Sequence, residues 1–193
     1  VIRILAELGY SVRAAVRHPE LAEHLQPLGA VGQIMPVAAS VRNKKSVERA
    51  VEGACAVINL VGILYESGAQ KFDSVQAKGP ATVAEVCKEQ GIDTLVHISA
   101  IGADENSPAV YAKTKAAGEK AVLDAMPNAV IFRPSIVFGP EDDFFNRFGG
   151  MAQMFPTLPL IGGGHTKFQP VYVGDVALAI ANAAENKVEA GKI

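Results

Sequence analysis

The chain has 193 residues and a formal net charge of −2, and 49% of its residues are hydrophobic and 20% charged. This length and composition predict one globular domain with a sizeable core and exclude a disordered chain. The charge balance offers no basic surface for nucleic acid, so no nucleic-acid partner is expected. The sequence predicts no metal site, because its histidines and cysteines lack metal-ligand spacing. No apolar run reaches the ~18 residues that a membrane-spanning helix needs.

The first part of the chain alternates between helical and strand patterns. Ile2, Leu5 and Leu8 recur at helical spacing and predict a helix closed by Gly9. Residues 54–61 form a nearly continuous apolar run, as expected for a parallel strand that is buried on both faces. In order, the expected elements here are helices or turns at 2–8, 21–28 and 46–51, and strands at 11–16, 33–37 and 54–61.

The same alternation continues to the end of the chain. Residues 70–90 predict a long helix, and Gly79-Pro80 predicts a kink within it. Strands are expected at 95–98 and 129–132, and helices from near Pro108, from Pro140 and over 173–184. This order predicts an α/β fold with a doubly wound parallel sheet of the Rossmann type.

Both ends of the sequence look cut. Val1 is not a Met and already lies in a helical pattern, whereas 191–193 resemble the entry to another strand. We therefore expect 1–193 to be a single domain, truncated at both ends, that lacks its first strand and its C-terminal substrate region. Such a segment on its own should expose unpaired strand edges and aggregate.

Cys55 and Cys87 both lie in apolar, patterned segments. We expect two reduced thiols in the core, which is typical of a cytoplasmic or mitochondrial-matrix protein.

Residues after the second strand distinguish the two nicotinamide cofactors in this fold. A carboxylate there binds the ribose 2′-hydroxyl of NAD, whereas an Arg accommodates the 2′-phosphate of NADP. Here Arg17 follows the strand, Arg13 lies within it, and no acid occurs before Glu20. The pattern favours NADP(H) over NAD(H); the alternative is that Arg17 is a solvated loop charge.

Ligands bind outside the carboxyl ends of the strands in such a sheet. Asn59, Gly62, Ser99 and the pair Pro134-Ser135 all fall at such ends. Gly62 would let the backbone approach a ligand closely, and Asn59 alternatively caps its strand.

Tyr111 and Lys115 are four residues apart, so a helix places both on one face. A phenol has a pKa near ~10, and a neighbouring ammonium lowers that pKa by favouring the phenolate. The pair therefore suits proton transfer to or from a carbonyl or alcohol oxygen. The alternative is an ordinary helix with a half-buried Tyr and a solvated Lys.

The order of strand, Ser99, helix with Tyr111 and Lys115, second strand and Arg-Pro-Ser resembles the short-chain dehydrogenase/reductases, in their extended or atypical branch. More narrowly, three segments resemble the alpha-subcomplex subunit 9 family of respiratory complex I and its bacterial relatives. They are YAKTKAAGE (Tyr111–Glu119), RPSIVFGPEDDFFNRF (Arg133–Phe148) and FQPVYVGDV (Phe168–Val176). The resemblance spans essentially the whole chain.

This resemblance implies a nicotinamide dinucleotide site and names its residues. The implied cofactor-binding residues are Arg17, Asn59, Gly62, Tyr111, Lys115, Pro134 and Ser135. The implied catalytic residues are Tyr111 and Lys115, with Ser99 as the hydroxyl that hydrogen-bonds the substrate oxygen. Extended members often have several Ser at this place, whereas here Ser99 is followed by Ala100-Ile101-Gly102.

The resemblance further implies a complex I accessory subunit with a tightly bound, structural NADPH. It would lie in the cytoplasm at the inner face of a bacterial inner membrane, or on the matrix side in a mitochondrion. One alternative is an active NAD(P)H-dependent oxidoreductase, or a sugar-nucleotide epimerase or reductase, that uses Tyr111 and Lys115. The third interpretation, after the accessory subunit and the active enzyme, is a regulator that senses NADP(H).

The uncharged segment 149–164 is rich in Met, Phe, Pro and Gly, and Asp142 or Asp143 should cap the helix that precedes it. Three interpretations stay open: a flap over the substrate cleft, a surface for a partner or membrane interface, and plain core. The partner interpretation uses Phe144–Leu160 and implies peripheral-arm subunits of complex I.

Overall fold

The computed structural model describes residues 1–155, 157 and 161–193, and its strands form three parallel sheets. The central sheet has the order β3-β4-β5, from β3 (Ala56–Asn59), β4 (Thr94–Ile98) and β5 (Val130–Phe132). β1 (Val12–Val16) pairs with β2 (Ile34–Ala38), and β6 (Val137–Phe138) pairs with β7 (Val171–Tyr172). Parallel pairing throughout matches the alternating sequence pattern.

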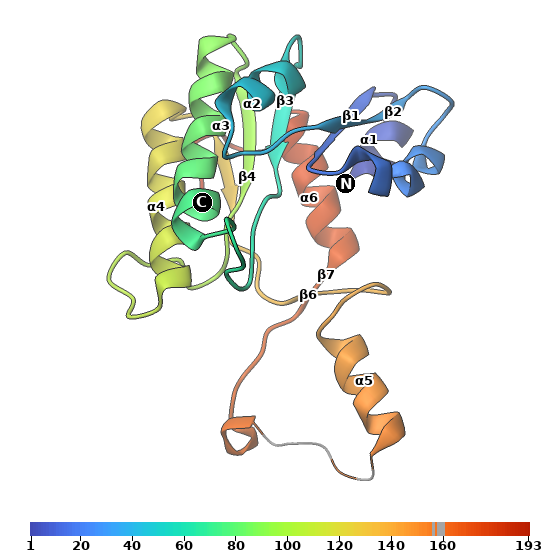
Figure 1. Ribbon diagram of the computed structural model, residues 1–193, viewed down its shortest axis with the longest axis vertical. Coiled ribbons are helices and arrows are strands. Elements are labelled where there is room, and N and C mark those ends of the chain that lie inside the picture. Colours follow the sequence, from blue (N-terminus) through green and yellow to red (C-terminus); the bar gives the residue numbers. More distant parts are fainter. Residues whose placement is uncertain (156, 158–160) are drawn as a thin grey trace.

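Helices cover both faces of the central sheet (Figure 1). One face is covered by α2 (Lys44–Val51), α3 (Lys78–Glu89) and α4 (Val110–Ala125), and the other by α6 (Val173–Ala184). The remaining helical elements are α1 (Ile2–Glu7), η1 (Pro19–Leu21), η2 (Glu23–Leu28), η3 (Asp73–Ala77), α5 (Phe145–Met154) and η4 (Ile161–Gly164). Among the described residues, no helix combines the length and the apolar character that crossing a membrane requires.

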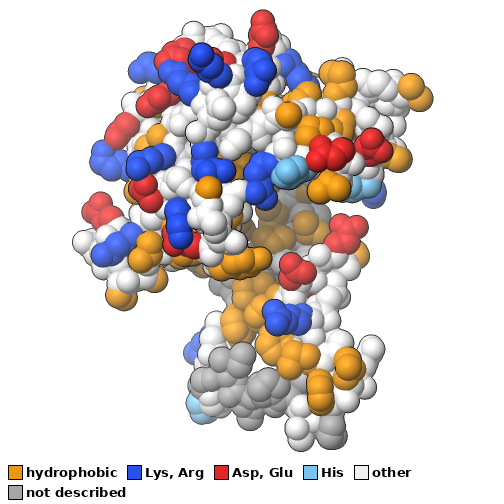
Figure 2. Space-filling view, viewed as in Figure 1, with side chains coloured by type: hydrophobic (Ala, Val, Ile, Leu, Met, Phe, Trp, Pro, Cys, Tyr) orange, Lys and Arg blue, Asp and Glu red, His pale blue; other side chains and the backbone are white. Residues whose placement is uncertain are grey.

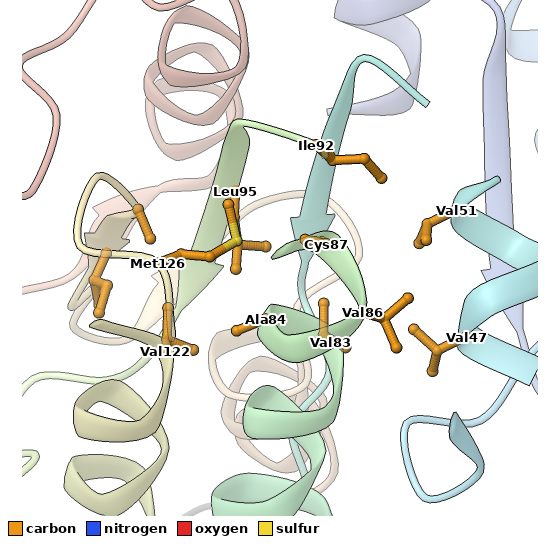
Figure 3. Close-up of a cluster of buried hydrophobic side chains, with 12 residues drawn as sticks. Val47, Val51, Val83, Ala84, Val86, Cys87, Ile92, Leu95, Val122 and Met126 are labelled. Carbon is orange, nitrogen blue, oxygen red and sulfur yellow. The ribbon is translucent and has the colours of Figure 1, made fainter. Parts of the chain in front are cut away.

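The core is divided by the sheet because neighbouring residues of a strand point to opposite faces. Leu95 of β4 belongs to one buried cluster with Val86 of α3 and Val122 of α4 (Figure 3). Val96, the next residue along β4, packs instead with Ile180 of α6. Burial of each such side chain contributes about 1.5–3 kcal/mol, so the two clusters hold the three layers together.

The parallel sheet is interrupted between β1 and β3, which belong to different sheets. β3 packs on both faces, as expected, because Val57 packs against the cluster of Leu95 and Ile58 against the cluster of Val96; Ala56–Ile58 are half-buried.

Three expectations need correction. The predicted helix over 70–90 is a π-helical η3 followed by α3, so its irregularity precedes Gly79-Pro80. The helix expected from Pro140 begins at Phe145. Cys87 is buried as predicted, but Cys55 is exposed because it lies in the turn before β3 and not in the strand itself.

α5 projects from the body of the molecule as an arm (Figure 1). The Asp142 carboxylate caps α5 by accepting hydrogen bonds from the backbone N–H groups of Phe145 (2.5 Å) and Asn146 (3.4 Å), as predicted. No residue of α5 is buried, so the interpretation of 149–164 as plain core is wrong for the part that lies in this helix, 149–154. Residues 156 and 158–160 of the predicted partner segment lie outside the described residues.

Candidate dinucleotide site

The carboxyl ends of β3, β4 and β5 lie side by side and carry most of the predicted site residues. Asn59 ends β3 opposite His97 of β4. The N–H of Ser99 donates to the carbonyl of Phe132 at 2.8 Å, and the N–H of Ile101 donates to the carbonyl of Pro134 at 2.9 Å. The prediction that these residues meet at one edge of the sheet is therefore confirmed.

Lys115 of α4 is buried at this edge, with 5% of its surface exposed. Its Nζ donates a hydrogen bond to the carbonyl oxygen of Ile98 at 3.2 Å. The same Nζ lies 3.4 Å from the point that a Cβ on Gly62 would occupy. Burial lowers the pKa of Lys115, and the Glu119 carboxylate partly opposes this shift. The helix thus presents one desolvated cation beside the backbone at Gly62.

Tyr111 lies one helical turn before Lys115 and is half-buried. Its ring packs edge-to-face on Phe72, with 5.8 Å between the ring centroids. Burial raises the pKa of Tyr111, so the predicted lowering by a neighbouring ammonium is wrong in this structure. The physical reason is that the hydrogen bond of the Lys115 ammonium goes to Ile98 and not to the phenol.

Asn59 and His97 form a buried pair behind this edge, 4% and 1% exposed. The Asn59 Nδ2 lies 3.2 Å from the His97 Nδ1, and the Asn59 Oδ1 accepts from the N–H of Val61 at 3.1 Å. Since an amide nitrogen only donates, His97 Nδ1 accepts and its ring proton lies on Nε2. Burial, assisted by the Lys115 charge, lowers the pKa of His97 to about 4. A neutral His97 therefore holds Asn59, and Asn59 holds the turn that leads to Gly62.

Ser99 follows β4 and is 4% exposed. Its Oγ is enclosed and has no hydrogen-bond partner among the residues that the structure describes. A buried hydroxyl without a partner is costly unless something bonds it, so this position fits a polar ligand atom. The Ser99 hydroxyl and the open backbone at Gly62 together fit the ribose and amide groups of a nicotinamide nucleotide.

The two arginines near the end of β1 have different surroundings. Arg13 donates to the carbonyls of Ala50 (3.0 Å) and Glu52 (2.5 Å), so it ties β1 to the end of α2. Arg17 is exposed just beyond β1 and makes no hydrogen bond or ion pair within the described part of the chain. Of these two arginines, Arg17 is the one whose guanidinium has no partner within the described part of the chain.

An ion pair between a buried carboxylate, Glu119, and an exposed guanidinium, Arg133, was not predicted from the sequence. Glu119, 3% exposed, accepts from Arg133 Nε at 2.8 Å and from Arg133 Nη2 at 2.5 Å. The sequence contained a signal, because Glu119 continues the four-residue spacing of Tyr111 and Lys115. His97 also went unnoticed, since a lone histidine in an apolar strand gives no indication of its partner.

The family model for the RmlD substrate binding domain matches residues 20–193. The chain belongs to this family. Its resemblance to the extended short-chain dehydrogenase/reductases is thereby confirmed. Over 188 residues the chain is 38% identical to NADH dehydrogenase [ubiquinone] 1 alpha subcomplex subunit 9, mitochondrial, of Arabidopsis thaliana, covering 96% of this chain and 47% of that protein. It is 28% identical to the ceramide reductase of Caulobacter vibrioides, covering 83% of this chain and 49% of that protein.

This member of the RmlD family spans about half the length of those curated relatives. Among solved structures it is similar to the UDP-glucuronic acid 4-epimerase of Bacillus cereus in complex with UDP-glucuronic acid and NAD. The TM-score is 0.77 at 21% identity, covering 99% of this chain and 71% of the epimerase. The doubly wound, Rossmann-type fold predicted from the sequence is therefore confirmed.

Proposed function

We propose that residues 1–193 form one NAD(P)(H)-binding domain whose tightly held NADPH has a structural role, as part of an accessory subunit of respiratory complex I. The observation that supports the site most strongly is the meeting of Lys115, Gly62 and Ile98 at the carboxyl edge of the sheet. This is where a doubly wound sheet binds its ligand. A buried ammonium beside an open backbone provides a charge-assisted donor for ribose hydroxyls.

The proposed roles follow from the positions of the side chains. Lys115 and Tyr111 bind the nicotinamide ribose, and Pro134 and Ser135 border the nicotinamide. Asn59 shapes the turn to Gly62, and Gly62 lets the dinucleotide approach. The bound dinucleotide would supply hydride-transfer chemistry.

NADP(H) is preferred over NAD(H) in this proposal because of Arg17. Its guanidinium is exposed beyond β1, where the fold positions the adenosine ribose. A planar guanidinium with several donors matches a phosphate well, and no carboxylate before Glu20 competes for it.

Tight binding without rapid turnover is favoured by the state of Tyr111. A general acid works best when its pKa lies near the operating pH, whereas burial moves the pKa of Tyr111 further upward. The second candidate function is an active reductase in which Tyr111 exchanges the proton, Lys115 tunes it and Ser99 holds the substrate oxygen. The 28% identity to a ceramide reductase supports that alternative.

The proposed partners are peripheral-arm subunits of complex I or the adjoining membrane interface, contacted through Phe144–Leu160. The described part of this segment presents Phe145, Met154 and Phe155 at 41%, 78% and 56% exposure. Figure 2 shows hydrophobic side chains on the visible face of the arm. The 38% identity to a complex I subunit supports this choice of partner. The subunit would lie on the matrix side in a mitochondrion, or on the cytoplasmic side of a bacterial inner membrane.

A turnover assay separates the two functions. The protein at its natural length is loaded with NADPH and mixed with quinones and with aldehyde or ketone substrates, and the nicotinamide absorbance is followed. The structural proposal predicts that the bound NADPH persists in every mixture. Repeated oxidation of NADPH, abolished by Tyr111→Phe, would establish the reductase instead.

A further inference from the structure

The ion pair between Glu119 and Arg133 lies next to Lys115, the cation of the proposed dinucleotide site. Glu119 occurs on the same face of α4 as Lys115, one turn further along. Its carboxylate acts on the charge of Lys115 and also on that of His97. Because residues four apart on a helix are neighbours on its surface, the Glu119 carboxylate lies next to Lys115 along α4.

Arg133 is the hydrogen-bond partner of the Glu119 carboxylate. It approaches from the chain just after β5 and donates two hydrogen bonds to the two carboxylate oxygens of Glu119. This two-point contact is the strongest kind of pairing that a carboxylate makes with a side chain. With Arg133 in place, Lys115 Nζ bonds the Ile98 carbonyl and lies beside Gly62.

We propose that Arg133, by pairing with Glu119, keeps this carboxylate from binding Lys115 and so leaves the Lys115 ammonium free for the dinucleotide. Arg133 is thus a positioning residue that acts through Glu119. The inference rests on the proposed dinucleotide site and adds a residue that is not itself at the ligand. Without Arg133, a carboxylate that is only 3% exposed would lose its partner, and Lys115 is a neighbouring cation on the same face of α4. His97 is neutral and cannot replace the positive charge of Arg133.

A simpler role would be a clamp that ties α4 to β5. The two roles differ in what happens when both charges are removed together. If the pair is only a clamp, Arg133→Gln/Glu119→Gln lacks it as completely as Arg133→Gln alone. If Arg133 keeps the Glu119 carboxylate from Lys115, the additional change Glu119→Gln removes that carboxylate, so Lys115 is free again and NADPH binding is restored.

The test measures the dissociation constant of NADPH by nicotinamide fluorescence, using the protein at its natural length after removal of any bound nucleotide. Arg133→Gln should weaken binding about tenfold or more, a change of about 1.4 kcal/mol. Arg133→Gln/Glu119→Gln should recover to within about threefold of the wild type, and Arg133→Lys should retain most of the affinity. The matched control is Lys120→Gln/Asp124→Asn, which removes an exposed pair on the same helix (2.6 Å) and should leave the affinity unchanged.

Recovery in the double variant supports the inference. A double variant that binds as weakly as Arg133→Gln, or an Arg133→Gln that binds like the wild type, overturns it while the proposed function stands. If Arg133→Gln does not fold, Glu119→Gln decides, because a loss of about tenfold there contradicts the inference. A wild type that binds neither NADPH nor NADH overturns the proposed function and this inference with it.

Discussion

Lys115 Nζ lies 3.4 Å from the point that a Cβ on Gly62 would occupy. This distance is ordinary van der Waals contact, so the first carbon of a side chain fits but further atoms meet the ammonium. The close approach joins a residue that follows β3 to a residue on α4, and it forms the centre of the proposed site.

Substitution of Gly62 tests that close approach. Gly62→Ala should weaken NADPH binding because its Cβ hinders the approach of the dinucleotide. Gly62→Val should weaken binding further, about tenfold or more, because it also displaces Lys115. Fluorescence titration with NADPH measures both. Gly149→Val on α5 is the control, because nothing lies within 4 Å of a Cβ at Gly149. Equal binding by Gly62→Val and the wild type would refute the assigned contact.

Gly118 allows α4, the helix that carries Lys115, to pack closely on η3. A Cβ there would collide with the backbone carbonyl of Gln76, so α4 packs on the π-helical η3 only because Gly118 has no side chain. Gly118→Ala should lower the free energy of unfolding by about 1–3 kcal/mol or more, although Ala favours helix elsewhere. Chemical denaturation measures the loss, and Gly150→Ala, in open space on α5, should show none. An unchanged stability of Gly118→Ala would contradict this packing.

His97 should make the folded state sensitive to acid. Its pKa is lowered from 6.5 to about 4, so between these pH values the unfolded chain binds a proton that the folded chain does not. Stability should therefore be full above pH 6.5 and fall by about 3 kcal/mol as the pH drops to about 4, at about 1.36 kcal/mol per unit. Denaturation at several pH values should show a shallower slope for His97→Asn. The exposed His24→Asn serves as control, and an unchanged slope in His97→Asn would count against the prediction.

The arm should contribute to association and not to folding. Met154 and Phe155 are 78% and 56% exposed, so replacing both by Ser should change the free energy of unfolding by less than about 0.5 kcal/mol. The same variant should no longer migrate with complex I in native gels of membranes from cells that produce it. Val31→Ser, at another exposed apolar position, should migrate normally. Normal migration of the Met154/Phe155 variant would exclude this part of the arm as the contact surface.

The edge of the sheet was predictable because parallel strands bring their carboxyl ends together. Asn59, Ser99 and Pro134 could thus be grouped from the strand pattern alone. The direction of the Tyr111 pKa shift could not be predicted from the sequence, because it depends on the Phe72 ring and on the acceptor to which Lys115 donates. Spacing within one helix does not contain that information.

Polar contacts between different helices and strands could not be predicted from the sequence either. Glu119 and Arg133 are separated by a helix end and a strand, and only their packing makes the carboxylate need a cation. The π-helical turn over Asp73–Ala77 likewise depends on the fit between Gln76 and Gly118, which no local pattern encodes.

The most direct test of a structural NADPH is the nucleotide that the protein retains. The protein at its natural length is purified without added cofactor and denatured, and the released nucleotide is identified and counted by mass spectrometry. The account predicts about one NADPH per chain, lost in Lys115→Met and reduced in Arg17→Ser, because tight binders survive purification without free ligand. A protein that emerges empty and binds neither added NADPH nor added NADH would contradict it.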